Sequence, residues 1–132
     1  MFDPSTRVLV IDDMLTMRKI VGKACKSIGL TDIIEAKDGR DGWEKLTTSD
    51  KEVGLIVSDW NMPNCTGIEL LKRVRADGKY GALPFILVTA EKEGSQVKEA
   101  ILAGVSNYIV KPFDVDTFKV KVEEVYKKVT QS

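Results

Sequence analysis

Five short apolar runs recur along the chain, separated by longer segments in which apolar residues are more widely spaced. The runs are rich in β-branched residues and mostly continuous, which is typical of strands buried on both faces of a parallel sheet. They lie at 8–11, at 33–34 with its flanks, at 55–57, at 85–88 and at 108–110. We therefore expect five strands inside a sheet that is covered on both sides.

The segments between the runs repeat apolar residues at intervals of three and four, which is the spacing of an amphipathic helix. The predicted helical faces are formed by Met17, Ile20, Val21, Ala24 and Ile28, by Ile68, Leu71 and Val74, by Val97, Ala100 and Ile101, and by Val115, Phe118, Val122, Val125 and Val129. A further helix over 39–47 has the weakest pattern, because two glycines interrupt it.

Several helix ends carry signals of their own. Gly29 and Gly104 stand where the first and fourth helices should end, because glycine readily takes the left-handed conformation of a C-terminal cap. Asp114 is placed to cap the last helix, and Phe113 and Phe118 occupy the two positions of a hydrophobic staple. The boundaries of the last helix are therefore the best defined.

The alternation of strands and helices predicts a three-layer α/β sandwich around a parallel five-stranded sheet. A length of 132 residues suits one domain with a substantial core. We expect residues 1–6 to form a short N-terminal tail and residues 7–130 to form a single domain, since no internal repeat, low-complexity segment or linker is visible.

The composition excludes several classes of function. The 20 basic residues balance the 20 acidic ones, so no bulk positive charge favours nucleic acid or a membrane surface. The chain has no histidine and only two cysteines, Cys25 and Cys65, which excludes Cys/His zinc sites, Ser-His triads and histidine acid–base chemistry. No signal peptide is visible and no apolar run approaches the roughly 20 residues of a membrane span, so we expect a cytoplasmic protein.

Polar residues follow four of the predicted strands directly. They are Asp12 and Asp13 after the first strand, Asp59 after the third, Thr89 after the fourth and Lys111 after the fifth. The carboxyl ends of parallel strands meet at one edge of the sheet, where ligands bind in open α/β folds. A single acidic residue at such a place is as often a helix cap, but four strands that deliver such groups to one edge predict a functional site.

The chemistry of this set favours phosphoryl transfer. Three neighbouring carboxylates repel one another and need a cation to hold them, and ligation by oxygen alone suits Mg2+. A carboxylate can itself be the nucleophile, which gives an aspartyl-phosphate. The ammonium of Lys111 and the hydroxyl of Thr89 are suited to stabilise the charge that spreads over the phosphoryl oxygens.

Several motifs, taken in order and at their spacings, resemble the response-regulator receiver family, and in particular its chemotaxis members, along nearly the whole chain. The matching stretches are VLVIDD at 8–13, TMR at 16–18, SDWNMPN at 58–64, RADG at 75–78, VTAE at 88–91 and VKPF at 110–113. The resemblance implies a flavodoxin-like (βα)5 fold with strand order 2-1-3-4-5 and a cis bond between Lys111 and Pro112. The family often reads Met-Asp-Gly at 65–67, where this chain has Cys-Thr-Gly, but Thr66 and Glu69 preserve a capping box.

The same resemblance implies the roles of the acidic residues. Asp59 would be the phosphoacceptor, and Asp12 and Asp13 would position Mg2+. Asp59 itself and the backbone carbonyl of Asn61 would complete the protein ligands.

Further roles are implied for residues that follow the later strands. Thr89 would move toward the phosphoryl group and Lys111 would pair with it. Tyr108 matches an aromatic residue that swings inward on activation. Asn61 and Glu91 match positions that influence how fast water removes the phosphoryl group.

The resemblance implies a single-domain response regulator and not an enzyme, although it would assist its own phosphorylation and autodephosphorylation. A histidine kinase of the CheA-like chemotaxis type would donate the phosphoryl group, and the donor must be external because the chain has no histidine. The face of the fourth helix, fifth strand and fifth helix would then change its affinity for a target, which is the flagellar motor switch protein if the chemotaxis assignment holds. A phosphatase is a further partner; we expect a monomer that binds neither nucleic acid nor membrane.

Alternatives remain open at this point. The sequence separates a chemotaxis switch poorly from a phosphorelay shuttle or a phosphate sink. A phosphatase of the haloacid dehalogenase type also uses Asp, Mg2+, Thr and Lys, but there the nucleophile follows the first strand as Asp-x-Asp. Here Asp12 and Asp13 are adjacent, and the second residue after Asp59 is Asn61, which cannot act as an acid. A flavodoxin-type redox protein would need a Ser/Thr/Gly-rich phosphate loop where this chain has 12–14 as DDM.

Overall fold

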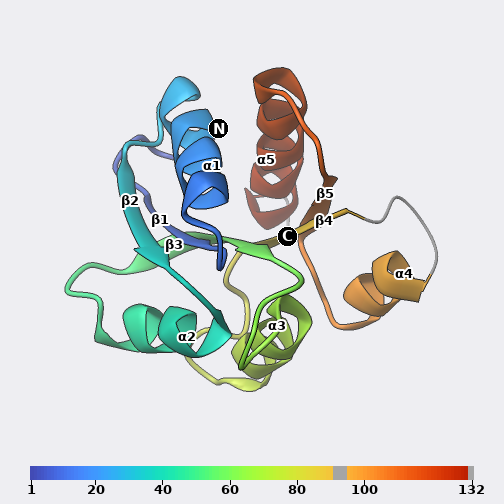
Figure 1. Cartoon of the computed structure of the whole chain (residues 1–132). Coiled ribbons are helices and arrows are strands. Elements are labelled where there is room, and N and C mark those ends of the chain that lie inside the picture. The colour runs from blue at the N-terminus through green and yellow to red at the C-terminus, as the bar shows by residue number, and fades with distance from the viewer. Residues whose placement is uncertain (91–94, 131–132) are drawn as a thin grey trace.

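The computed structural model describes residues 1–90 and 95–130, which form ten alternating strands and helices (Figure 1). In chain order these are β1 (Arg7–Ile11), α1 (Leu15–Ser27), β2 (Asp32–Ala36), α2 (Gly39–Thr48), β3 (Val53–Asp59), α3 (Gly67–Ala76), β4 (Phe85–Thr89), α4 (Ser95–Leu102), β5 (Asn107–Val110) and α5 (Val115–Thr130). The strands pair in parallel in the order β2-β1-β3-β4-β5. The predicted fold class and strand order are confirmed.

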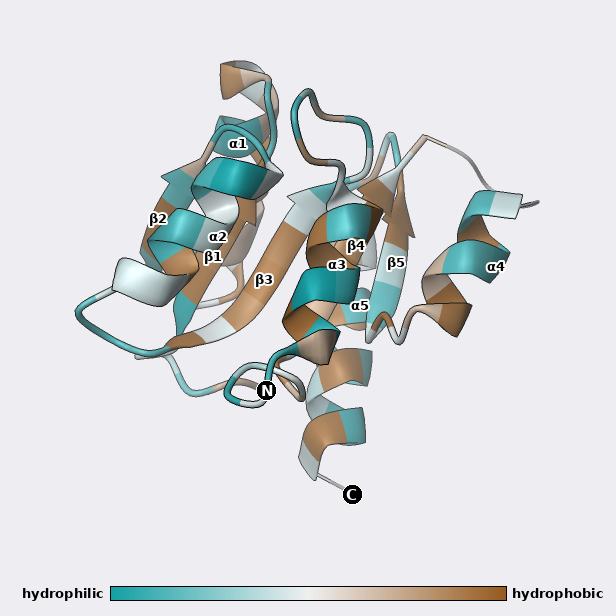
Figure 2. Cartoon of the chain, turned by 90° about the horizontal axis from the view of Figure 1, so that it is seen from below, coloured by the Kyte–Doolittle hydropathy of each residue, from teal (hydrophilic) through white to brown (hydrophobic). Residues whose placement is uncertain are grey.

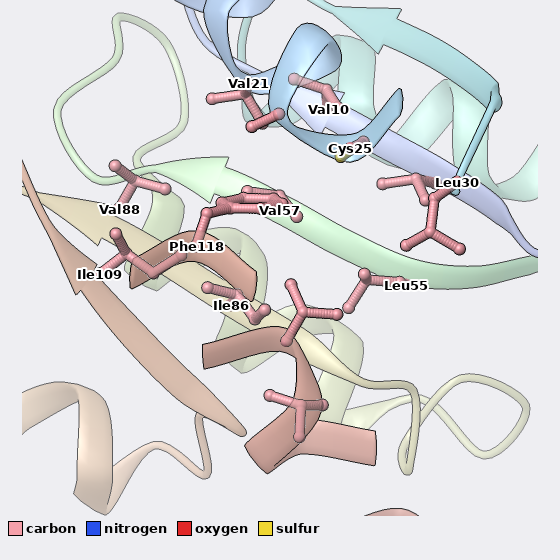
Figure 3. Packing of buried hydrophobic residues seen from close by; sticks show 14 of the residues in the cluster. Val10, Val21, Cys25, Leu30, Leu55, Val57, Ile86, Val88, Ile109 and Phe118 are labelled. Atoms are coloured by element: carbon pink, nitrogen blue, oxygen red, sulfur yellow. The ribbon is translucent and has the colours of Figure 1, made fainter. Parts of the chain in front are cut away.

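The sheet lies between two helical layers, with α1 and α5 on one face and α2, α3 and α4 on the other (Figure 1). Successive strand residues point to opposite faces, so Val8 and Val10 pack under α1 and α5 whereas Leu9 and Ile11 pack toward α2 and α3. Figure 3 shows the first of these cores, in which Phe118 of α5 lies among residues of the central strands. In Figure 2 β3 is coloured largely as hydrophobic, as a central strand covered on both faces requires.

The predicted helix ends are confirmed. Gly29 and Gly104 take φ values of 92° and 90°, which are accessible to glycine at little cost. At the start of α5 the Asp114 carboxylate accepts a hydrogen bond from the backbone N–H of Thr117 at 2.8 Å. The rings of Phe113 and Phe118 are stacked with their centroids 5.8 Å apart, so the hydrophobic staple is present.

Helix α2 forms despite its glycines, because they let it approach its neighbours closely. A methyl group added at Gly42 would lie 2.5 Å from Cδ1 of Ile11 in β1. The helix also has a strong start, where Asp38 caps the backbone N–H of Asp41. The weak pattern in the sequence therefore reflects a packing requirement and not an unstable helix.

The predicted apolar faces are correct in the middle of the helices and less so at their margins. Ile20 in α1, Ile101 in α4 and both terminal valines of α5, Val115 and Val129, are exposed. The N-terminal segment contributes to the core in turn, because Phe2 is buried against the ring of Tyr126 with 5.4 Å between ring centroids. Within 1–90 and 95–130, no helix is both long and apolar enough to cross a membrane.

Candidate phosphoryl-acceptor site

The carboxyl ends of β1 and β3 bring three carboxylates together. Asp12 and Asp13 follow β1, and Asp59 is the last residue of β3. Because these strands are adjacent and parallel, one oxygen from each of the three residues lies within 4.8 Å of the others. Asp12 and Asp59 are only 3% and 8% exposed, whereas Asp13 faces solvent. The cluster thus combines two buried carboxylates with a third that is open to solvent.

Lys111 closes the acidic cluster from the other side. Its Nζ atom lies 2.9 Å from Oδ1 of Asp59 and 3.7 Å from Oδ2 of Asp12. The backbone of Lys111 is held at the strand end, since its N–H donates to the carbonyl of Thr89 at 2.8 Å. The peptide bond to Pro112 is cis, as the resemblance implied. The ammonium group therefore reaches both buried carboxylates from the end of β5.

The surroundings shift the pKa of one of these acids upward. Burial raises the pKa of Asp12, and the charge of nearby Asp59 acts in the same direction. The N–H of Met14, which donates to Asp12 Oδ1 at 2.9 Å, and the ammonium of Lys111 oppose that rise only in part. A positive ion bound beside Asp12 would relieve this penalty.

Thr89 is buried at the end of β4, next to this edge, and its hydroxyl has a definite partner. Oγ1 of Thr89 donates to Oε1 of Gln96, in the first turn of α4, at 3.0 Å. Sequence reasoning singled out Thr89 but not Gln96, because a contact between side chains seven positions apart, one on a strand and one on a helix, leaves no periodic signal. Thr89 is therefore linked to α4 in this conformation.

The loop from Trp60 to Thr66 follows Asp59 and is joined tightly to the strand end. The backbone N–H of Trp60 donates to the carbonyl of Val88 at 3.0 Å, and the N–H of Gly67 donates to the carbonyl of Trp60 at 2.9 Å. Gly67 is required here, because a side chain would collide with the Asp59 carbonyl. Trp60 is only 6% exposed and packs into the core, whereas Asn61 faces solvent.

Two further predicted residues, Tyr108 and Glu91, are not part of the acidic cluster that the structure describes. Tyr108 is half-buried in β5, and Nζ of Lys121 lies 5.1 Å from the centre of its ring. Glu91 lies outside the described residues. The structure thus brings together Asp12, Asp13, Asp59 and Lys111, with Thr89 beside them.

The comparison with known families identifies the domain. A family described as the response regulator receiver domain matches residues 8–123 of the chain. The chain belongs to this family. Receiver domains of the CheY type are non-catalytic signalling domains.

Individual relatives point to chemotaxis regulators. The receiver domain is 44% identical over 119 residues to the chemotaxis protein CheY homolog of Campylobacter jejuni, an alignment that covers 90% of this chain and 91% of that protein. It is 41% identical to the chemotaxis protein CheY1 of Helicobacter pylori, with 90% and 95% covered. The solved structure of CheY4 of Vibrio cholerae superposes with a TM-score of 0.82 at 30% identity and covers 92% of this chain and 98% of that one.

Receiver domains bind Mg2+ at an acidic pocket, and the cluster in this receiver domain fits that ion. Its donors are all carboxylate oxygens, which a hard divalent cation prefers. Two of the three are buried and would repel each other without a cation. The residues that would hold the ion are Asp12, Asp13 and Asp59, which the sequence had singled out.

Proposed function

We propose that this receiver domain accepts a phosphoryl group on Asp59 from a histidine kinase and thereby changes its affinity for a partner in chemotaxis. The observation that carries the proposal is the position of Asp59, whose buried carboxylate lies beside those of Asp12 and Asp13 and 2.9 Å from the ammonium of Lys111. The likeness to chemotaxis proteins of Campylobacter jejuni and Helicobacter pylori supports the pathway. The proposed donor is of the CheA-like type and the proposed target is the flagellar motor switch protein.

In the proposed reaction an oxygen of Asp59 attacks the phosphorus of a phosphohistidine on the donor. The new O–P bond forms as the P–N bond breaks, and the histidine nitrogen leaves with the bonding electrons. Lys111 is placed to pair with a phosphoryl oxygen, because its Nζ already lies 2.9 Å from Oδ1 of Asp59. Mg2+ bound by Asp12, Asp13, Asp59 and the carbonyl of Asn61 would supply neutralisation of the phosphoryl charge.

The switch would then run through Thr89 and Tyr108. Thr89 would leave Gln96 to hydrogen-bond the phosphoryl group, and this movement would pull on the first turn of α4. The resulting change would be read at the face of α4, β5 and α5, where Tyr108 is half-buried beside Lys121. Asn61 and Glu91 would set the rate at which water removes the phosphoryl group.

A chemical labelling experiment tests the acceptor. Incubation with labelled acetyl phosphate and Mg2+ should give a stoichiometric adduct that is stable in acid and labile in base, as an acyl phosphate is. Asp59→Asn should abolish the adduct, whereas Asp116→Asn, an exposed carboxylate in the first turn of α5, should keep it in full. Full labelling of Asp59→Asn would refute the proposed acceptor.

The chemotaxis assignment needs a separate measurement. Binding to a fluorescent peptide from a flagellar motor switch protein should strengthen when acetyl phosphate and Mg2+ are added, and Asp59→Asn should remove the effect. Equal binding with and without the phosphodonor would exclude this target and would favour a phosphate sink or shuttle.

A further inference from the structure

The loop between β3 and α3 is hydrogen-bonded to the start of α2 at two places. Nδ2 of Asn64 donates to Oδ2 of Asp38 at 3.0 Å, and the N–H of Gly39 donates to the carbonyl of Cys65 at 3.2 Å. This is the loop that carries Asn61, whose backbone carbonyl the proposed function assigns to the cation. The position of Asn61 therefore depends on contacts outside β3.

Asp38 is built to hold this loop. It is only 5% exposed, and its two oxygens have separate tasks: Oδ1 accepts from the N–H of Asp41 at 2.8 Å and Oδ2 accepts from Asn64. Burial by itself would raise the pKa of Asp38, but these hydrogen bonds, together with the backbone N–H of Arg40 and the charge of Lys37, outweigh it and keep the pKa below its usual value. The bond to Asn64 is thus one between an amide and an ionised acceptor, which is stronger than a neutral pair.

The backbone on both sides of this bond is shaped for it. Asn64 has a φ of 67°, a left-handed conformation that asparagine tolerates better than most residues. Across from it, a methyl group added at Gly39 would lie 2.6 Å from Sγ and 2.7 Å from the carbonyl oxygen of Cys65. The start of α2 and the loop therefore come into close contact at Gly39 and Cys65, next to the bond between Asn64 and Asp38.

The turn that carries Asp38 also reaches the other side of the acidic cluster. The N–H of Asp12 donates to the carbonyl of Ala36 at 3.1 Å, and Ala36 is the last residue of β2. Asp38 follows two residues later. The short segment from Ala36 to Asp38 thus connects the loop of Asp12 with the loop of Asn61, so it spans the site from one group of ligands to the other.

We propose that Asp38 and Asn64 are positioning residues for the cation site. Their hydrogen bond holds the loop of Asn61 against α2, and its loss lowers the affinity for Mg2+ while the fold persists. This inference rests on the proposed function, since it concerns the same site. Groups that orient metal ligands typically change metal affinity by about 10–100-fold when they are removed, and we expect about tenfold here.

The test is a Mg2+ titration followed by the fluorescence of Trp60, which directly follows Asp59. Trp43 is the other tryptophan of the chain, and it is replaced by phenylalanine in the parent and in every variant. Asn64→Asp sets two carboxylates against each other and should weaken Mg2+ binding about tenfold. Adding Asp38→Asn exchanges donor and acceptor, keeps an oxygen to cap Asp41, and should restore the affinity. Urea unfolding without Mg2+ is measured for each.

Two further variants separate the hydrogen bond from charge and from failure to fold. Arg40→Gln, at an exposed position of α2, changes the net charge by the same one unit and should leave the Mg2+ affinity unchanged. Asn64→Gly deletes the amide but permits the left-handed backbone, so it should lose the same affinity as Asn64→Asp if the latter cannot be purified folded.

The outcomes separate this inference from the function on which it rests. Unchanged Mg2+ affinity in Asn64→Asp or in Asn64→Gly, no recovery in the exchanged pair, or an equal loss in Arg40→Gln would overturn the positioning role. In all these cases the parent would still bind Mg2+ and label Asp59. A parent that shows neither binding nor labelling would overturn the proposed function, and the positioning role with it.

Discussion

Helices α4 and α5 precede and follow the same edge strand, β5, along the chain, but they are packed very differently. α5 runs over 16 residues and buries Phe118, Val122 and Val125 against the sheet. α4 runs over 8 residues and buries only Ala100, while Ile101 and Leu102 are 61% and 80% exposed. In Figure 1 α5 lies along the sheet, whereas α4 stands off at its side.

The difference indicates which part of the domain would respond to the proposed phosphorylation. An element with few buried apolar contacts can move at a low cost in free energy, and moving parts of proteins are commonly of this kind. α4 is also the helix whose first turn accepts the hydroxyl of Thr89, through Gln96. The weakly held helix is therefore the one that is connected to the proposed site, and α5 serves as a fixed wall beside it.

The largest effect on stability should come from truncating a buried side chain of α5. Phe118 is fully buried, and Phe118→Ala should lower the free energy of unfolding by about 3–5 kcal/mol, since it removes a large side chain and leaves a cavity. Ile101→Ala, the matched change on α4, should alter it by less than about 0.5 kcal/mol. Urea unfolding measures both. Comparable losses at the two positions would show that α4 is held as firmly as α5.

The sequence predicts this contrast only in part. The stripe of α5 predicts Phe118, Val122 and Val125 correctly as core, but it extends to Val115 and Val129, which are exposed. Ile101 has the same helical spacing, yet it is exposed, because α4 is short and lies off the sheet. Periodicity reports which face of a helix is apolar and does not report whether a neighbour covers that face.

The candidate site shows the same division. Asp12, Asp59 and Lys111 could be brought together from the sequence, because parallel strands deliver their last residues to one edge. The bonds Thr89–Gln96 and Asp38–Asn64 could not, since they join side chains of separate loops and helices whose relative positions follow from the packing of the whole domain. Strand order predicts which strand ends lie side by side. It does not predict pairs such as these, which depend on side-chain rotamers and on the conformation of turns.

A smaller effect should follow from cutting the link between α4 and the site. Gln96→Leu removes the hydrogen bond that the Thr89 hydroxyl donates to Gln96 in the unphosphorylated conformation. A hydrogen bond contributes about 0.5–1.5 kcal/mol net. At limiting acetyl phosphate, the ratio of phosphorylated to unphosphorylated protein should therefore rise about 2–10-fold. The free energy of unfolding should change by no more than about that amount. Quantitative labelling and urea unfolding measure the two quantities.

The control for this link is a double-mutant cycle with Thr89→Val. In that background the hydroxyl is absent, so Gln96→Leu should have no further effect on labelling. An equal rise in both backgrounds would mean that Gln96 acts on the site by another route, and α4 would lose its assigned connection to Thr89.

The smallest effect concerns the start of α5, where the Asp114 cap stabilises the helix independently of its buried residues. The N–H and hydroxyl of Thr117 hydrogen-bond the Asp114 carboxylate and keep its pKa below the ordinary value. Because the pKa is lower in the folded state, the carboxylate contributes stability above the unfolded pKa of about 3.9 and loses it as the pH falls through the folded pKa. Asp114→Asn keeps an oxygen to cap the helix but cannot titrate. The difference in urea midpoint between the parent and Asp114→Asn should therefore shrink or reverse as the pH is lowered from 5 toward about 2. A difference that stays constant with pH would show that the cap acts only as an uncharged acceptor, and the firmness of α5 would then rest on Phe118 and its neighbours alone.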